Sequence, residues 1–122
     1  MQLVVAGRQA TTRRAVSMFV GTRLGMEVLG DAKDYEELMN LVMANQPDLI
    51  LLNEDLPGVE LGELIPTLRG LDFSPAVIVL NEKPETEEAA LAAGADAFVY
   101  KGDHPKRLLI AVQSVRIARQ GA

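Results

Sequence analysis

The chain has 122 residues, of which 48% are hydrophobic and 24% charged, and its formal net charge is −5. This length and composition are typical of one globular domain and exclude a disordered or fibrous chain. The absence of cysteine excludes disulfides and thiolate metal sites, and a single histidine, His104, argues against the usual zinc sites and histidine-dependent catalysis. No apolar stretch approaches the roughly 18 residues of a membrane span, so we expect a cytoplasmic protein without membrane contact.

Charge is distributed unevenly along the chain. Residues 31–99 contain 15 acidic residues and three basic ones, whereas the two ends contain nine basic residues and two acidic ones. The overall negative charge argues against nucleic acid as the partner of the whole surface. The segregation predicts a basic face shared by the first and last helices, and two ordinary solvated helix faces are the alternative interpretation.

The chain opens with a strand and a helix. Residues 3–6 form a short apolar run that predicts a strand, and Gly7 ends it. Thr11 or Thr12 is expected to cap a helix whose apolar residues recur at helical spacing as far as Val20.

A second unit of the same kind follows. Residues 26–29 predict a strand that is closed by Gly30. Asp34 is followed three residues later by Glu37, which is typical of a capping box, and a helix is predicted over residues 35–44.

The middle of the chain carries the most apolar runs. Residues 49–52 are apolar without alternation, which predicts a strand covered on both faces. A loop at 53–58 leads to a helix through residues 61–68, which Pro66 is expected to bend or shorten. Residues 77–80 predict the fourth strand.

The last units complete a regular alternation. Pro84 suits the first turn of a helix that reaches Ala93, and Gly94 suits its end. Residues 97–100 predict a fifth strand, and Pro105 opens the final helix. Five strands alternating with five helices predict a single α/β domain over the whole chain, with a parallel sheet between two helical layers.

Ligands of such sheets bind beyond the carboxyl ends of the strands. The turn at residues 7–10 has neither the glycine-rich dinucleotide pattern nor the P-loop pattern, which argues against nucleotide sites of those kinds.

Two segments resemble bacterial response-regulator receiver domains. Residues 51–58, LLNEDLPG, are similar to the receiver acceptor loop, and residues 94–101, GADAFVYK, are similar to its fifth-strand region. Residues 28–32, VLGDA, are similar to receivers that precede LuxR-type DNA-binding domains. The resemblance extends from Leu3 to about Arg119 and implies a three-layer, doubly wound, flavodoxin-like fold with strand order 2-1-3-4-5.

The resemblance also locates the family chemistry, and most of it is missing. The aspartate that accepts the phosphoryl group corresponds to Asn53, and an amide is not an anionic nucleophile. The acidic pair that holds Mg²⁺ corresponds to Gly7 and Arg8, and an arginine adds a positive charge where the ion binds. We therefore expect no bound metal and no cofactor.

The remaining family positions are retained only in part. The Ser/Thr switch corresponds to Asn81, whereas the conserved lysine is present as Lys101, and Phe98 takes the place of the movable aromatic residue. The resemblance thus implies a pseudo-receiver that has kept the fold and lost phosphotransfer, and we expect it not to be an enzyme.

An internal ion pair is one way to stabilise such a pocket. We expect Arg8 to pair with Glu54 or Asp55 as a built-in cation, the alternative being an exposed Arg8 without a partner. Lys101 is expected to pair with Glu54 or to donate to the side-chain oxygen of Asn53. Glu54 and Asp55 otherwise remain solvated, bind a cation or act as an acid–base pair.

A domain that has lost its phosphotransfer chemistry can still act by binding other proteins through its surface. Basic side chains of the first and last helices are expected to form one face suited to an acidic partner, a second copy included: Arg13, Arg14, Arg23, Lys106, Arg107, Arg116 and Arg119. Ile110 and Ile117 lie off the buried stripe of the last helix and form either a second apolar face or the edge of the core.

These observations predict an atypical receiver of two-component signal transduction that works without phosphorylation, through protein–protein contact or as a homodimer. The LuxR-type resemblance implies a role in transcription regulation and a C-terminal DNA-binding domain in the intact protein, but no DNA contact is assigned to these residues. One alternative is a small-molecule or anion sensor that uses the vacated pocket, and another is a receiver with residual phosphotransfer.

Overall fold

The structure, a computed structural model, describes residues 1–53 and 56–120. Five parallel strands form one sheet in the order β2-β1-β3-β4-β5, which confirms the predicted topology. The strands are β1 (Gln2–Gly7), β2 (Glu27–Ala32), β3 (Leu49–Asn53), β4 (Ala76–Asn81) and β5 (Ala97–Tyr100). Each of the five predicted strands is present, and the bounds differ by three residues at most.

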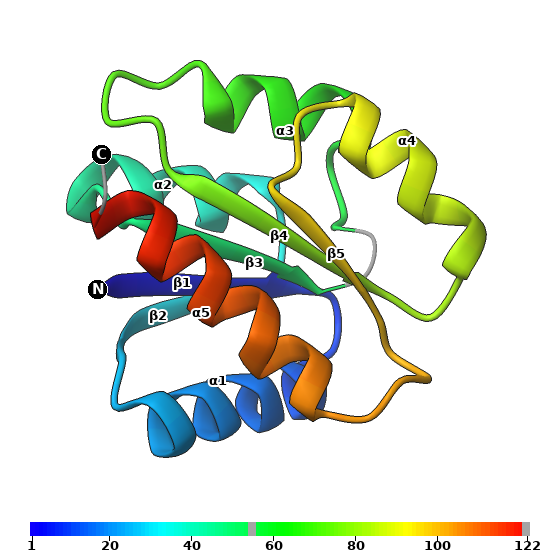
Figure 1. Cartoon of the computed structure of the whole chain (residues 1–122). Helices are drawn as coiled ribbons and strands as arrows, with labels where there is room; N and C mark the ends of the chain where they lie inside the picture. The colour runs from blue at the N-terminus through cyan, green and yellow to red at the C-terminus, as the bar shows by residue number, and fades with distance from the viewer. Residues whose placement is uncertain (54–55, 121–122) are drawn as a thin grey trace.

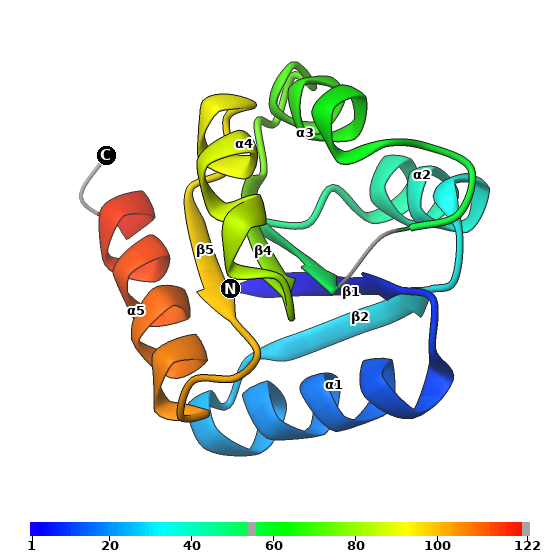
Figure 2. The same ribbon diagram turned by 90° about the vertical axis from the view of Figure 1, so that its right-hand side faces the viewer.

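Helices cover both faces of the sheet. They are α1 (Ala10–Leu24), α2 (Tyr35–Asn45), α3 (Leu61–Arg69), the 3₁₀ turn η1 (Pro84–Thr86), α4 (Glu87–Ala92) and α5 (Lys106–Gln120). α1 and α5 lie on one face, and α2, α3 and α4 lie on the other (Figures 1 and 2). Among the described residues, no helix is both long and apolar enough to cross a membrane.

The core consists of two apolar layers separated by the sheet. Val4 and Ala6 of β1 pack under α2–α4, whereas Leu3 and Val5 pack under α1 and α5. β3 is buried along its whole length because both of its faces are covered. The lack of alternation in its sequence is thereby explained.

The prediction that Gly30 ends the second strand is wrong. β2 continues to Ala32, and its register against β1 shifts, so that Leu3 pairs with Val28 and Val4 pairs with Gly30. A side chain at position 30 has little room, because a Cβ there would lie 3.0 Å from a methyl carbon of Leu41. Glycine in a strand often marks such an irregularity and not the end of the strand.

The two predicted helix caps had different outcomes. The side chain of Asp34 accepts a hydrogen bond from the backbone N–H of Glu37 at 2.9 Å, which confirms the predicted cap of α2. The prediction that Thr11 or Thr12 caps α1 is wrong. The helix begins at Ala10, and its N-cap residue, Gln9, makes no side-chain capping bond. Thr11 and Thr12 therefore lie in the first turn.

Candidate functional site

The carboxyl edge of the sheet gathers four of the predicted pocket residues. Gly7 at the end of β1 pairs with Asn53 at the end of β3. Asn81 ends β4 and pairs with Tyr100 of β5. The next residue, Lys101, donates its backbone N–H to the carbonyl of Asn81 at 2.9 Å. The strand order thus places Gly7, Asn53, Asn81 and Lys101 along one edge.

β1 and β3 approach each other closely where they end. A Cβ atom added to Gly7 would lie 2.7 Å from the backbone oxygen of Asn53 and 3.2 Å from its Cβ. Asn53 is 1% exposed, and its Oδ1 accepts no hydrogen bond from the residues that the structure describes. The expected contact between Lys101 and that oxygen is therefore wrong. A buried acceptor that is left without any donor costs about 1–3 kcal/mol, which makes Asn53 a position where an apolar side chain can be tested.

Asn81 and Phe98 have structural roles at this edge. The Oδ1 atom of Asn81 accepts from the backbone N–H of Lys83 at 2.9 Å, which fixes the turn after β4. Phe98 is half-buried, packs against the core under α2–α4 and pairs with Val79. Both side chains help to hold β4 and β5 in place.

Arg8 points away from the core. Its side chain is exposed and lines an open hollow of about 520 Å³ together with residues 56–62. The predicted pairing of Arg8 with Glu54 or Asp55, and of Lys101 with Glu54, involves residues that lie outside the described part of the chain. These two pairings stay predictions.

Arg13 is a cation that the structure fixes at this edge. Its Nε lies 3.0 Å from Oδ2 of Asp31, and its Nη1 donates to the carbonyls of Gly7 at 2.8 Å and Arg8 at 3.3 Å. The side chain is 12% exposed. Arg13 therefore does not belong to the interaction surface to which the sequence assigned it, because its guanidinium joins α1 to the ends of β1 and β2.

One feature of the sequence predicts this contact. Asp31 lies near the end of the second strand, and the carboxyl ends of adjacent parallel strands meet at one edge. An arginine in the first turns of the helix that follows β1 can reach that edge. The contact was missed because Arg13 and Arg14 were assigned together to the outer face of the helix.

The described residues at this edge do not fit Mg²⁺, the ion that the receiver resemblance implies. Mg²⁺ requires hard oxygen ligands in near-octahedral geometry. Gly7 has no side chain, Arg8 is a cation, and the carboxylate of Asp31 is paired with Arg13. Residues 1–53 and 56–120 contain no group of three or more acidic or histidine side chains placed to hold a metal ion.

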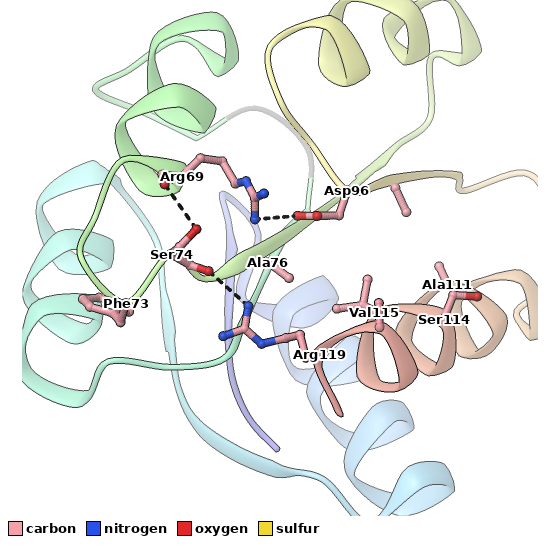
Figure 3. Close-up of a pocket in the computed structure, with 11 residues that line it drawn as sticks. Arg69, Phe73, Ser74, Ala76, Asp96, Ala111, Ser114, Val115 and Arg119 are labelled. Carbon is pink, nitrogen blue, oxygen red and sulfur yellow. Dashed lines mark hydrogen bonds and ion pairs between the residues drawn. The ribbon is translucent and has the colours of Figure 1, made fainter. Parts of the chain in front are cut away.

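A second hollow, of about 550 Å³, lies at the opposite edge of the sheet (Figure 3). Nη1 of Arg69 lies 3.2 Å from Oδ2 of Asp96, and Nη1 of Arg119 donates to the carbonyl of Ser74 at 3.0 Å. These contacts join the α3–β4 connection to β5 and α5. Arg119 therefore has a structural contact and is also removed from the predicted basic surface.

The rest of the predicted interaction surface lies on α1 and α5. Arg14, Lys106 and Arg107 are exposed, and Arg116 is half-buried. Ile110 and Ile117 are 48% and 65% exposed. They form an outward apolar face, and the alternative that they border the core is wrong.

Comparison with known proteins agrees with this arrangement. The sequence model of the response regulator receiver domain matches residues 3–113. The oxygen regulatory protein NreC of Staphylococcus epidermidis is 27% identical over 118 residues, which cover 94% of this chain and 54% of NreC. NreC of Staphylococcus aureus is 29% identical over 119 residues, with the same coverage. The chain thus spans about half the length of the curated relatives it matches.

Solved structures show the same fold. The response regulatory domain of protein mrkE from Klebsiella pneumoniae has a TM-score of 0.89 at 17% identity, with 100% of both chains covered. A LuxR-family DNA-binding response regulator from Staphylococcus aureus has a TM-score of 0.82 at 23% identity, covering 93% of this chain and 97% of that one. With the family match over residues 3–113 and this sheet topology, the chain belongs to the response regulator receiver domain family.

Proposed function

We propose that this receiver domain acts without being phosphorylated, as a module that contacts protein partners. The observation that carries the proposal is Asn53, which ends β3 with its side chain 1% exposed. Formation of an acyl phosphate requires a carboxylate oxygen that attacks phosphorus, and a neutral amide offers no such nucleophile. The burial of Oδ1 adds a second barrier, because an incoming phosphoryl donor has no access to that atom.

The contacts of Arg13 at the carboxyl edge also support the proposal. A receiver that binds Mg²⁺ needs uncompensated carboxylates at the carboxyl edge, so that a cation is attracted to them. Here a guanidinium 3.0 Å from Asp31 supplies positive charge from within the chain, and its bonds to the carbonyls of Gly7 and Arg8 hold the edge in one arrangement. We infer that this edge needs no ligand to adopt its working geometry.

The test is a titration of the ¹⁵N-labelled domain with beryllofluoride, a phosphoryl mimic, with and without Mg²⁺, monitored by amide chemical shifts. We expect the shifts of residues at the ends of β1, β3 and β4 to stay unchanged. The Asn53→Asp variant is the matched control. Its amide chemical shifts are also expected to stay unchanged, because the metal-binding acids are still absent. Shifts in the unmodified domain that require both additives would contradict the proposal.

A second candidate function, an anion sensor, is favoured by one feature. The exposed guanidinium of Arg8 lines a hollow of about 520 Å³ at the carboxyl edge. Inorganic phosphate would then raise the melting temperature, and Arg8→Ala would abolish the increase, whereas Arg14→Ala would keep it. An equal response of all three proteins, or no response at all, would exclude the sensor.

We further propose that the intact gene product regulates transcription through a C-terminal DNA-binding domain. The relatives support this, since the chain spans 54% of NreC and a similar solved structure is described as a DNA-binding response regulator. The mass of the native protein isolated from cells tests the proposal. A native protein of 13.2 kDa, the mass of this chain, would contradict it.

A further inference from the structure

The two helical layers carry opposite charge. α1 and α5 together contain seven arginine or lysine residues and no acidic residue. Arg13 and Arg119 are held in ion pairs with Asp31 and Asp48, so the other five form the basic face. The helices of the opposite layer, α2, α3, η1 and α4, contain six glutamates and one arginine. Because the sheet separates the layers (Figure 2), the domain has a basic face and an acidic face on opposite sides.

Much of this charge is available for contact. Arg14, Lys106 and Arg107 on the basic face are exposed, and none of them forms an ion pair within the described part of the chain. The same holds on the acidic face for Glu87 and Glu88 of α4. Charges that are neither paired nor buried can be neutralised only by solvent ions or by a partner.

Each face also presents apolar side chains beside its charges. On the basic face, Met18 of α1 is 72% exposed, and Ile110 and Ile117 of α5 are 48% and 65% exposed. On the acidic face, Leu91 of α4 is 44% exposed. Exposed apolar side chains beside unpaired charges supply both kinds of group that protein interfaces contain.

We propose that the basic α1–α5 face of one copy binds the acidic α4 face of a second copy, head to tail. The inference rests on the proposed function, a module that acts by contact, and it names the partner. A second copy fits because the complementary face is built into the same chain, on the side that the first contact leaves open. Since the joined surfaces differ, every complex retains one unused face of each kind, and association continues beyond the dimer.

Association between the basic and acidic faces is expected to depend on salt concentration. Exposed charges more than about 8 Å apart are screened at physiological ionic strength, so the attraction between faces is strongest in dilute salt. The net charge of −5 opposes the approach of two copies in general, so attraction needs an orientation that brings unlike charges together. The arrangement therefore favours a single relative orientation and weak, reversible assembly.

The test is sedimentation velocity on the whole chain, over a range of concentrations, at low and high salt. One variant reverses the basic face, Lys106→Glu with Arg107→Glu, and a second reverses the acidic face, Glu87→Lys with Glu88→Lys. Glu27→Lys with Asp72→Lys changes two exposed charges outside both helical layers and is the matched control. Circular dichroism melting establishes that each variant is folded.

We expect the unmodified chain and the control to form species larger than dimers at low salt and to dissociate at high salt. Each reversed variant alone should associate at least tenfold more weakly. Mixed in equal amounts, the two reversed variants are complementary at both contacts, one native and one with the charges exchanged, and they should recover association beyond the dimer.

Two results would overturn the inference: an unmodified chain that is monomeric at every concentration, or a dimer that is indifferent to salt and to both reversals. Neither result affects the proposed independence from phosphorylation, which beryllofluoride tests separately.

Discussion

Replacing Arg13 with glutamine removes the charged contact between α1 and the ends of β1 and β2. Its hydrogen bond to the Gly7 carbonyl, at 2.8 Å, is partly buried, and hydrogen bonds from charged donors contribute about 1.5–3 kcal/mol. The ion pair with Asp31 adds less, about 0.2–1 kcal/mol, because that carboxylate is 42% exposed and screened by solvent. Water can rehydrate part of the exposed edge, so we expect a net loss of about 2 kcal/mol in the free energy of unfolding.

The assay is thermal and urea unfolding followed by circular dichroism. In a domain of this size, a loss of about 2 kcal/mol lowers the melting temperature by roughly 6–10 °C. Arg14→Gln is the control, because Arg14 is exposed and substitutions at such sites change stability by about 0.5 kcal/mol or less. A double-mutant cycle that combines Arg13→Gln with Asp31→Asn isolates the contribution of the ion pair to the free energy of unfolding. Equal losses of stability for Arg13→Gln and Arg14→Gln would show that the contacts of Arg13 do not stabilise the fold.

Four further substitutions test the packing of the carboxyl edge and the α2 cap. Gly7→Ala should lower the free energy of unfolding by about 1–3 kcal/mol in urea, because the new Cβ would lie 2.7 Å from the Asn53 backbone oxygen; an unchanged urea midpoint would show that the edge relaxes freely. Asn53→Leu should raise the melting temperature, since it removes the buried oxygen that has no donor, whereas Asn81→Leu should lower it by breaking the 2.9 Å bond to Lys83. The same direction of change for both asparagines would be inconsistent with this difference. Asp34→Ala should cost about 1 kcal/mol and reduce helical ellipticity through loss of the α2 cap, and wild-type stability would show that the cap is dispensable.

The strands were predictable because each is a short apolar run between polar segments. β3 is the clearest case, since a strand buried on both faces needs apolar residues at every position. The end of β2 was not predictable in the same way. Gly30 has the local signature of a strand end, but its place within β2 depends on pairing with Val4, which is distant in sequence.

The candidate site was predictable to the extent that strand ends determine it. Gly7 and Asn53 each follow an apolar run, and parallel pairing brings them together. The role of Arg13 depends instead on a side-chain direction and on Asp31, 18 residues away. Helical periodicity cannot distinguish an arginine that faces solvent from one that reaches across the end of a sheet.

Intact-protein mass spectrometry is the decisive test of whether Asn53 can carry a phosphoryl group. The chain is incubated with acetyl phosphate and Mg²⁺, beside a receiver with an intact aspartate as a positive control. We predict that the control gains one phosphoryl group while the mass of this chain is unchanged. A Mg²⁺-dependent gain of one phosphoryl group on this chain would contradict the proposed independence from phosphorylation.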